Sequence, residues 1–447
     1  MRILLTVHQF FPQYAAGTET LTRSVARELM ARGHEVRILA GFPAQQAMAD
    51  KDRCDEYDFE GIHVYRFHHA YTTMAGQSTK IELGYDNRLA AAYFERIVQG
   101  FQPDIVHFFH LNRLGTRLIT LAAQAKIPAF YTPTDFWAVC PTAQLLLPNG
   151  RLCQGPNVLG GNCVKHFAQS AQQGSGAKLA QWLPVPLINF IVRLTRADVL
   201  PAYPQRAEVN AMSSRLDVNV ARLNQLTKII APNRFMCDLL MKHGVQSHRI
   251  VQSAFGVDVT ENEKTVERTQ ARQPLRVGFI GTLAQHKGCH VLIEGFKSLP
   301  PGRAILKIYG NPTEFPDYAV ALKHLAGEEP AIEFCGVFPN AHMAQVLSDL
   351  DVLVVPSLWY ENTPLVLISA QASSCPVLAS NFPGISDVIQ DGVNGLLFKP
   401  GDAADLTRQL TRLIAEEGLT GRLAAHARPP RSTADYVDAL IAIWSAG

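Results

Sequence analysis

The residues best suited to chemistry gather around Glu361, in the second half of the 447-residue chain. A buried strand over 352–355 leads to a turn with Glu361, a helix that begins at Thr363-Pro364, and a second strand over 376–380. This order predicts a βαβ unit, whose parallel strands present ligands at their carboxyl ends. Thr363 can cap the helix and Pro364 suits its first turn, so free backbone N–H groups would favour a phosphate. A carboxylate beside an anion site suits a sugar diphosphate; the alternative is an ordinary capped helix with a surface glutamate.

The first part of the chain offers two further candidates. Arg2–Val7 has the composition of a buried parallel strand, and the loop after it lacks the G-x-G-x-x-G fingerprint of dinucleotide sites. That loop ends near Gly17, where the backbone can approach a ligand closely. A later strand, 103–110, carries His107 and His110, whose side chains cannot both face one way. His110 is nearer the carboxyl end of the strand and is the better candidate for a site residue. The alternative is that His110 is a histidine of the core or one that only supports the site.

A cysteine series follows the next strand. Cys140, Cys153 and Cys163 are followed by His166, three residues after the last of them. Cys163 and His166 have the spacing of metal ligands, and two more thiols could complete a tetrahedral structural zinc site. The upstream spacings are not those of a standard zinc finger. Free thiols in a loop and a redox pair are the alternatives.

The segment 178–196 is apolar, is flanked by cations and contains two prolines. It is too short to span a bilayer. An interfacial helix with Trp182 and Phe190 on its apolar side is one interpretation, and a helix packed on the core of its own domain is the other.

The stretch 256–274 is polar, charged and poor in apolar residues, as linkers are. A new α/β pattern begins with a strand over 275–280. Lys287 lies in the first strand-to-helix loop of this second pattern, and we expect it opposite the turn that carries Glu361. A lysine there can neutralise a diphosphate as a point charge; alone, it is only a surface lysine.

Composition places the chain among ordinary globular proteins. Its hydrophobic content is 47%, its charged content 18% and its formal net charge +2, so two or three domains are expected and nucleic acid is not an expected partner. The apolar run at the N-terminus is too short for a secretory signal and continues into a strand and helix pattern, which favours a cytoplasmic protein. Eight scattered cysteines fit reduced thiols.

The ordered blocks resemble those of the retaining glycosyltransferases of family 4, which have the GT-B fold. The likeness extends over almost the whole chain, through MRILLTVHQFFPQYAAGTET, PDIVH, TDFWAVCP, IIAPNRF, FIGTLAQHKGCHVLIEGF, VPSLWYENTPLVL and DGVNGLLFKPGD. The resemblance implies an α/β protein with two Rossmann-like, doubly wound domains facing across a cleft. It also implies transfer of a sugar from a UDP- or GDP-linked donor with retention of configuration and no required cofactor or metal.

The resemblance also implies roles for single residues. Lys287 would contact the donor diphosphate, Glu361 would hold hydroxyls of the donor sugar, and His110 would lie near the reacting centre. The implied donor-binding set is Gly17, Thr282, Val337, Asn362, Thr363, Pro364, Leu365 and Ser369. In that set Gly17 would face the leaving diphosphate, and the backbone of Val337 would touch the base.

Four positions depart from the family pattern. Ser369 stands where a ribose-binding glutamate is usual, Thr282 where an arginine is frequent, Thr134 where a histidine often precedes Asp135, and 383–387 differ from the usual G-G-x-x-E turn. A serine is shorter and uncharged, and Thr282 removes a positive charge from the diphosphate site. A non-catalytic GT-B protein that binds nucleotide or carbohydrate is therefore the alternative function, and a nucleotide-sugar epimerase is a third.

The expected organisation is an acceptor-side domain over 1–255, a linker over 256–274, a donor-binding domain over 275–430, and a terminal helix over 431–447 that packs back on the first domain. We expect a glycan or lipid-linked acceptor in surface polysaccharide or other glycoconjugate biosynthesis. The expected location is cytoplasmic, with weak contact to the inner face of a membrane as an option.

Overall fold

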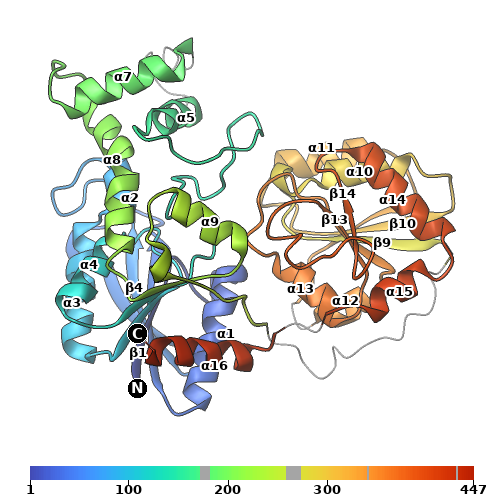
Figure 1. Ribbon diagram of the computed structural model, residues 1–447, viewed down its shortest axis with the longest axis horizontal. Helices are drawn as coiled ribbons and strands as arrows, with labels where there is room; N and C mark the ends of the chain where they lie inside the picture. Colours follow the sequence, from blue (N-terminus) through green and yellow to red (C-terminus); the bar gives the residue numbers. More distant parts are fainter. Residues whose placement is uncertain (172–181, 258–272, 340–341, 429–430, 447) are drawn as a thin grey trace. The chain divides into compact units, whose positions relative to one another are not determined.

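The computed structural model describes residues 1–171, 182–257, 273–339, 342–428 and 431–446. Two compact units account for them (Figure 1). Unit 1 comprises 1–232, 236–255 and 433–447, and unit 2 comprises 233–235 and 256–432. Most of the predicted linker, 258–272, lies outside the described residues.

Unit 1 is built on an eight-stranded sheet in the order β3-β4-β2-β1-β5-β6-β7-β8. All neighbouring strands are parallel except the β3–β4 pair. The strands are β1 (Arg2–Val7), β2 (Glu35–Pro43), β3 (Cys54–Phe59), β4 (Ile62–His69), β5 (Ile105–Phe108), β6 (Ala129–Tyr131), β7 (Lys228–Ala231) and β8 (Ile250–Gln252). The main helices are α1 (Gly17–Ala31), α2 (Lys80–Tyr85), α3 (Arg88–Phe101), α4 (Arg117–Gln124), α5 (Gly161–Ala171), α7 (Val185–Arg196), α8 (Arg206–Leu223), α9 (Arg234–Lys242) and α16 (Thr433–Ser445).

Unit 2 has a six-stranded parallel sheet in the order β11-β10-β9-β12-β13-β14. The strands are β9 (Leu275–Ile280), β10 (Ala304–Tyr309), β11 (Ile332–Gly336), β12 (Val352–Val355), β13 (Val377–Ser380) and β14 (Leu396–Phe398). The helices are α10 (Cys289–Lys297), α11 (Pro316–Ala326), α12 (Met343–Ser348), α13 (Leu365–Ala372), α14 (Ala403–Ala415) and α15 (Leu419–Ala425). Both units are doubly wound, which confirms the predicted Rossmann-like fold class.

The strand order of each unit reverses next to its first strand. In unit 1 the reversal lies between β1 and β5, and in unit 2 between β9 and β12. Ligands of open parallel sheets bind outside the carboxyl ends of the strands at such a switch point. The loops after these four strands are therefore the places where each unit can hold a ligand.

The region 42–77 contains a β-hairpin that its pattern did not indicate. Strands β3 and β4 pair antiparallel, and β4 joins the edge of the sheet through parallel pairing with β2. Polar side chains such as Arg66 and His68 hide the strand pattern in the sequence. They contact Asp55 across the hairpin, at 2.7 and 3.1 Å, so side-chain pairing accompanies the backbone ladder.

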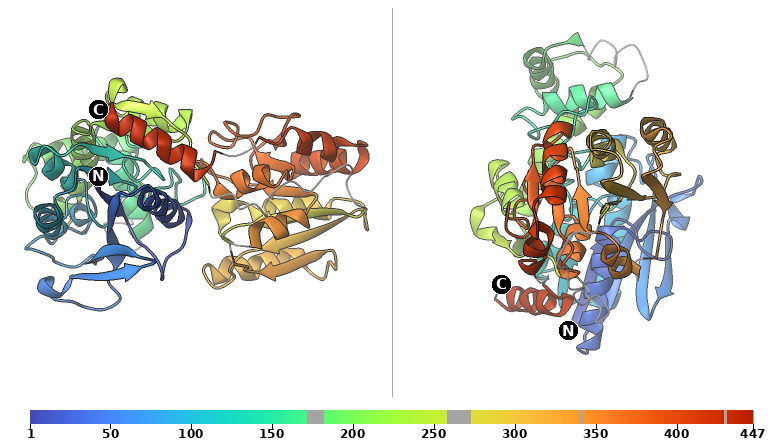
Figure 2. Two further views of the ribbon diagram at one scale, coloured as in Figure 1. Left: turned by 90° about the horizontal axis from the view of Figure 1, so that it is seen from below. Right: turned by 90° about the vertical axis from the view of Figure 1, so that its right-hand side faces the viewer.

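Helix α16 completes the core of unit 1 and packs across α1 (Figure 2). Tyr436, Leu440 and Trp444 are buried there with residues of β1 and β5. The Trp444 indole donates to Nδ1 of His107 at 3.2 Å, and the other ring nitrogen of His107 contacts the Thr132 hydroxyl at 2.9 Å. His107 is therefore a satisfied core histidine, and burial lowers its pKa to about 3.

His107 should make the protein sensitive to mild acid. The folded state keeps it neutral down to its pKa of about 3, whereas the unfolded chain binds a proton near pH 6.5, so stability falls as the pH drops below 6.5. The loss approaches about 1.4 kcal/mol per pH unit. Between pH 6.5 and 5, the free energy of unfolding should fall by about 2 kcal/mol less in His107→Gln than in the wild type, as measured by urea unfolding. His63→Gln, at a partly exposed ring on β4, is the control, and equal acid sensitivity of wild type and His107→Gln would contradict the assignment.

Candidate active site

The two residues assigned to the diphosphate and the sugar meet at the switch point of unit 2. The loop after β9 carries Lys287, and the turn after β12 carries Glu361. Nζ of Lys287 donates to Oε1 of Glu361 at 2.8 Å. The Glu361 residue is 6% exposed, whereas the side chain of Lys287 keeps 26% of its surface exposed. The structure thus brings together a buried carboxylate and a cation that solvent or a ligand can reach.

Three donors converge on the same oxygen of Glu361. Besides Lys287, the Ser357 hydroxyl donates to Oε1 at 2.6 Å and the Trp359 indole at 2.8 Å. Nζ of Lys287 also lies 4.9 Å from the centre of the Trp359 ring, within the range of a cation–π contact. Burial raises the pKa of Glu361, but Lys287 and the hydrogen bonds outweigh burial and hold it below its usual value. Glu361 is therefore ionised at neutral pH, and its Oε2 takes no part in this network.

Two glycines let the loops around Glu361 approach by their backbones. Gly288 has φ +72°, and a Cβ there would lie 1.9 Å from the carbonyl oxygen of Pro356. Gly384 has φ +84°, and a Cβ there would lie 1.8 Å from the carbonyl oxygen of Glu361. Backbone atoms cannot move aside as flexible side chains can, so both positions require glycine.

The helix after Glu361 begins later than predicted, and the prediction that Thr363 caps it was wrong. Helix α13 begins at Leu365 with Pro364 as its N-cap, and no side chain caps it. Thr363 has φ +139°, a strained conformation for a β-branched residue. Asn362 is buried, and its carbonyl oxygen accepts from the Asn233 side chain at 2.6 Å. The first-turn N–H groups of α13 still lie directly after the Glu361 turn.

Three other residues expected to bind the donor lie around the sheet of unit 2 but do not join the Glu361 network, whereas Gly17 belongs to unit 1. Thr282 is half-buried in the loop after β9, and Val337 is 71% exposed just after β11. Ser369 is half-buried within α13. Thr282 and Ser369 place neutral hydroxyls at positions where the related family often has charge.

His110 lies at the switch point of unit 1, just after β5, and is almost fully buried. The backbone N–H of Asn112 donates to its Nδ1 at 3.0 Å, so Nε2 carries the proton and donates to Asp135 at 2.8 Å. Asp135 also accepts from the backbone N–H of Trp137 at 2.8 Å. Both ring nitrogens of His110 are thus occupied, and this arrangement fits a fixed, neutral ring better than a free general base.

Sequence reasoning missed two residues beside His110. The rings of His8 and His110 lie 4.2 Å apart, and Nε2 of His8 lies 3.4 Å from Oε1 of Glu19. Burial and the neighbouring His110 and Arg113 lower the pKa of His8 well below its usual value, and burial raises that of Glu19. His8 is therefore neutral. Neither Glu19 oxygen nor Nδ1 of His8 has a well-formed hydrogen bond among the described residues.

The positions of His8 and Glu19 in the sequence could have indicated that they belong to a site. His8 directly follows β1, and Glu19 lies in the first turn of α1, two residues after Gly17. Gly17 is exposed as the first residue of α1, and no side-chain hydrogen bond caps the helix at its N-cap residue, Ala16. Polar residues at the carboxyl end of a central strand and at the start of the next helix favour a ligand site.

The expected zinc site is not formed. Cys140, Cys153, Cys163 and His166 all belong to the described residues, and no group of three or more potential ligands there could hold a metal. The sulfur of Cys140 contacts the Thr142 hydroxyl at 3.3 Å. The thiol of Cys153 is directed to the Gly155 carbonyl at 3.9 Å.

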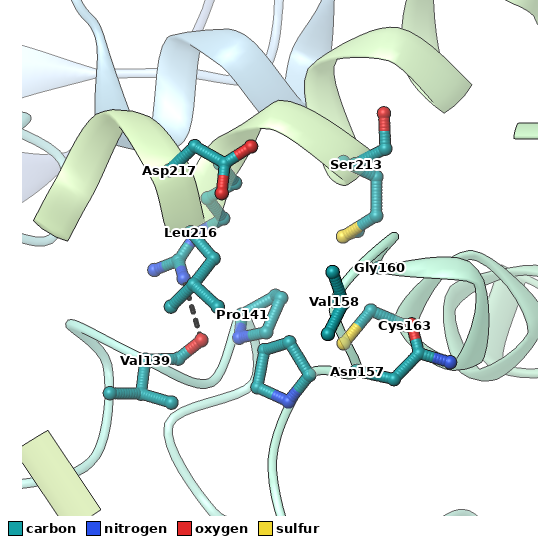
Figure 3. A pocket seen from close by; sticks show the side chains of 12 residues that line it. Val139, Pro141, Asn157, Val158, Gly160, Cys163, Ser213, Leu216 and Asp217 are labelled. Atoms are coloured by element: carbon teal, nitrogen blue, oxygen red, sulfur yellow. Dashed lines mark hydrogen bonds between the residues drawn. The ribbon is translucent and has the colours of Figure 1, made fainter. Parts of the chain in front are cut away.

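A buried cation beside the thiols gives the physical reason. Cys163 lines a small pocket with Val139, Pro141 and Arg215 (Figure 3). The Arg215 guanidinium donates to the Val139 carbonyl at 3.1 Å, the dashed line in Figure 3, and lies 5.0 Å from the Trp137 ring centre. Burial raises the pKa of Cys163, so the thiolate that zinc requires is disfavoured, and a neighbouring guanidinium repels a metal cation.

Two family models match the chain in the order of its two units. Residues 16–157 match the glycosyl transferase 4-like domain, and residues 274–416 match the glycosyl transferases of group 1. The chain is 30% identical to a D-inositol 3-phosphate glycosyltransferase of Nocardia farcinica, over 42% of this chain and 45% of that protein. It is 28% identical to the amylovoran biosynthesis glycosyltransferase AmsK of Erwinia amylovora, over 44% of this chain and 50% of that protein. The matched regions thus span about half the length of these relatives.

The fold also has close counterparts among solved structures. A crystal structure of HepE from Anabaena in complex with UDP and glucose matches with a TM-score of 0.63. The match covers 100% of this chain and 99% of that one at 16% identity, so it concerns the fold alone. Together with the two family models it identifies the fold as GT-B.

Removing the cation from the Lys287–Glu361 pair should destabilise unit 2. Lys287→Met leaves a buried carboxylate without its counter-charge, and we expect a cost on the order of 3 kcal/mol, measured as hydrogen-exchange protection of β12. The double variant Lys287→Met, Glu361→Gln should lose less stability than Lys287→Met alone, because it contains no buried charge without a counter-charge. The control is Lys399→Met, which breaks an exposed pair with Asp402 and should change the stability little, because solvent screens exposed pairs. Equal effects of Lys287→Met and Lys399→Met would contradict the pairing.

Proposed function

We propose that this chain, which belongs to the glycosyl transferases of group 1 and has the GT-B fold, moves a sugar from a nucleotide-sugar donor to a glycan or lipid-linked acceptor. The donor would be UDP- or GDP-linked, and the transfer would retain the anomeric configuration. The reaction would serve the synthesis of a surface polysaccharide or another glycoconjugate. The relative named for amylovoran biosynthesis supports the polysaccharide assignment.

The observation that carries the proposal is the Lys287–Glu361 pair at the switch point of unit 2. Lys287 is the partly exposed partner and can contact a diphosphate as a point charge. Glu361 is fixed by three donors on one oxygen, which leaves its Oε2 to accept hydrogen bonds from sugar hydroxyls. The adjoining start of α13 offers N–H groups to the same anionic ligand. A cation, amides and a fixed carboxylate together match a sugar diphosphate.

A retaining transfer at this site needs no protein nucleophile. The departing diphosphate can take the proton of the acceptor hydroxyl while fixed positive groups stabilise its developing charge. Lys287 and the first-turn amides of α13 would supply that stabilisation. A diphosphate bound there would share Lys287 with Glu361, so the cation is held in place before the donor arrives.

We assign the acceptor side to unit 1, around His110 and the His8–Glu19 pair. The Glu19 carboxyl group and the neutral His8 imidazole are suited to an acceptor hydroxyl, because both groups can accept a hydrogen bond and neither is saturated by well-formed hydrogen bonds among the described residues. His110, which Asp135 and the Asn112 backbone hold in place, would position the neighbouring His8 ring for that hydroxyl.

Two substitutions favour a second candidate, a non-catalytic GT-B protein that binds nucleotide or carbohydrate. Ser369 and Thr282 leave the donor side with fewer charged groups than is usual in the related family. In that case the Lys287–Glu361 pair would bind a ligand without turnover. The two candidates differ in whether product forms, and only the transferase requires a nucleotide sugar in every case.

We further propose that the protein acts in the cytoplasm, in part at the inner face of a membrane. A lipid-linked acceptor would require such a position. Its support in the structure is the exposed apolar surface of helices α5 and α7.

Nucleotide binding should depend on both members of the pair. We expect one of UDP, GDP or ADP, or a sugar conjugate of it, to raise the melting temperature. At a ligand concentration of a hundred times Kd the stabilisation would be about 2.7 kcal/mol. Lys287→Ala should weaken bare nucleotide and conjugate alike, whereas Glu361→Ala should weaken the sugar conjugate more, as measured by calorimetry. Lys399→Ala is the matched control, and a panel without any binding ligand would contradict the transferase and the nucleotide-binding candidate together.

Ser369→Glu separates the two candidates. If the site has lost activity, the added carboxylate should tighten donor binding and bring turnover, measured as release of nucleotide from the sugar donor with an acceptor present. If the wild type is an active enzyme whose Ser369 suits its own donor, the same change should lower turnover. Turnover in the wild type that Ser369→Glu reduces would rule out the non-catalytic candidate.

A further inference from the structure

An insertion between β6 and β7 exposes an unusual amount of apolar surface. Its described parts, 142–171 and 182–227, include α5, α7 and α8. Trp182 is 86% exposed and Phe190 57% exposed. Six of the twelve exposed large hydrophobic residues in the described chain lie in it: Val158, Phe167, Trp182, Leu187, Phe190 and Val199. So many exposed large apolar side chains within one insertion indicate a surface that a partner covers.

Helix α7 is apolar on both of its sides. Ile188 and Val192 are buried and face the rest of unit 1. Leu187, Phe190 and Leu194 follow one another at spacings of three and four residues, so they share the opposite face. A surface helix normally carries polar residues on that face. The outer face of α7 is therefore built to meet an apolar partner.

The charges of the same region are predominantly positive. The described residues from 158 to 206 contain four cations, Lys165, Arg193, Arg196 and Arg206, and one carboxylate, that of Asp198. Arg196 pairs with Asp217 and Arg206 with Asp198. Arg193 has no ion pair among those residues, and Lys165 reaches only the Leu183 carbonyl, at 2.8 Å, next to Trp182. Two uncompensated cations thus accompany the exposed aromatic rings.

The fold places this surface at one end of unit 1. Helices α5 and α7 pack on each other and on α8, beyond the end of the sheet (Figure 1). None of the helices among the described residues is long and apolar enough to cross a membrane. Any partner of this region would therefore bind to side chains on its surface and not to a membrane-spanning helix.

We propose that the outer face of α5 and α7 docks on an anionic lipid bilayer, with Trp182 and Phe190 inserted at the headgroup level. Tryptophan is suited to that depth because its ring is apolar and its N–H can contact water or headgroups. Arg193 and Lys165 match the negative surface of such a bilayer. Helices with an apolar face and flanking cations bind at this interface without crossing it. The inference specifies the surface behind the proposed membrane location, and it is independent of the sugar transfer.

Vesicle co-sedimentation tests the proposal on the full chain. The probes are vesicles of phosphatidylcholine alone and of phosphatidylcholine mixed with phosphatidylglycerol. We expect the wild type to bind the mixed vesicles at least tenfold more tightly than the neutral ones. Trp182→Ser with Phe190→Ser should lower that binding at least tenfold, and Arg193→Glu should lower binding to the mixed vesicles only. Met241→Ser with Val320→Ser removes two exposed apolar side chains elsewhere and should leave binding unchanged.

Three outcomes would overturn the proposal. The first is a wild type that stays in the supernatant with both kinds of vesicle, and the second is equal binding to both. The third is a Trp182→Ser, Phe190→Ser variant that binds as tightly as the wild type. If sedimentation equilibrium instead shows a dimer that the same variant converts to monomer, without vesicle binding, the surface joins two copies of this chain. Unchanged nucleotide affinity in the Trp182→Ser, Phe190→Ser variant would show that unit 2 is intact. This measurement distinguishes an error in the membrane proposal from an error in the transferase proposal.

Discussion

The ion pair between Lys287 and Glu361 is the interaction on which the switch point of unit 2 depends. A carboxylate with 6% exposure is costly to keep ionised, and the lysine cation, a serine hydroxyl and an indole N–H together offset that cost. The same contact fixes the loop after β9 against the turn after β12. Gly288 and Gly384 complete this arrangement, because only glycine permits the backbone approaches on either side. Stability and ligand chemistry therefore rest on the same few atoms.

Unit 1 uses its switch point differently. Its buried polar residues follow one another from Asp135 through His110 and His8 to Glu19. In the part of the chain that the structure describes, no lysine or arginine lies at hydrogen-bond distance from Glu19. The neutral state of His8 and the raised pKa of Glu19 follow from burial. A site with weak net charge suits hydroxyl groups, whereas the Lys287 site of unit 2 suits phosphates. This difference in charge is the basis of our proposal that unit 1 holds the acceptor and unit 2 the donor.

Much of this arrangement could be predicted from the sequence, because buried parallel strands are strong local signals. The strands that begin at Arg2, Leu275 and Val352 were predicted with their bounds, and the topology then placed Lys287 and Glu361 at neighbouring strand ends. The direct bond between these two side chains could not be predicted, because it depends on how Trp359 and Ser357 shape the turn. Thr363 illustrates the same limit. Its sequence context favours an N-cap, but the backbone around Glu361 gives it a strained φ and moves the helix start to Leu365.

Long-range packing explains the other differences. The spacing of Cys163 and His166 suits zinc, but Arg215, which arrives from α8, places a buried cation among the thiols. Nothing near Cys163 in the sequence reveals that neighbour. His8 and Glu19 were overlooked for the same reason, since they gain their significance only when β1 and β5 pair and bring them to His110. The sequence thus predicts elements well and predicts poorly those contacts that join distant elements.

A crystal structure of the protein with the nucleotide sugar that binds most tightly would test the proposed site most directly. We expect Nζ of Lys287 to contact the diphosphate, Glu361 to accept hydrogen bonds from the sugar hydroxyls, and the first turn of α13 to face the same ligand. A donor bound elsewhere, with Glu361 making no contact to the sugar, would contradict the central claim.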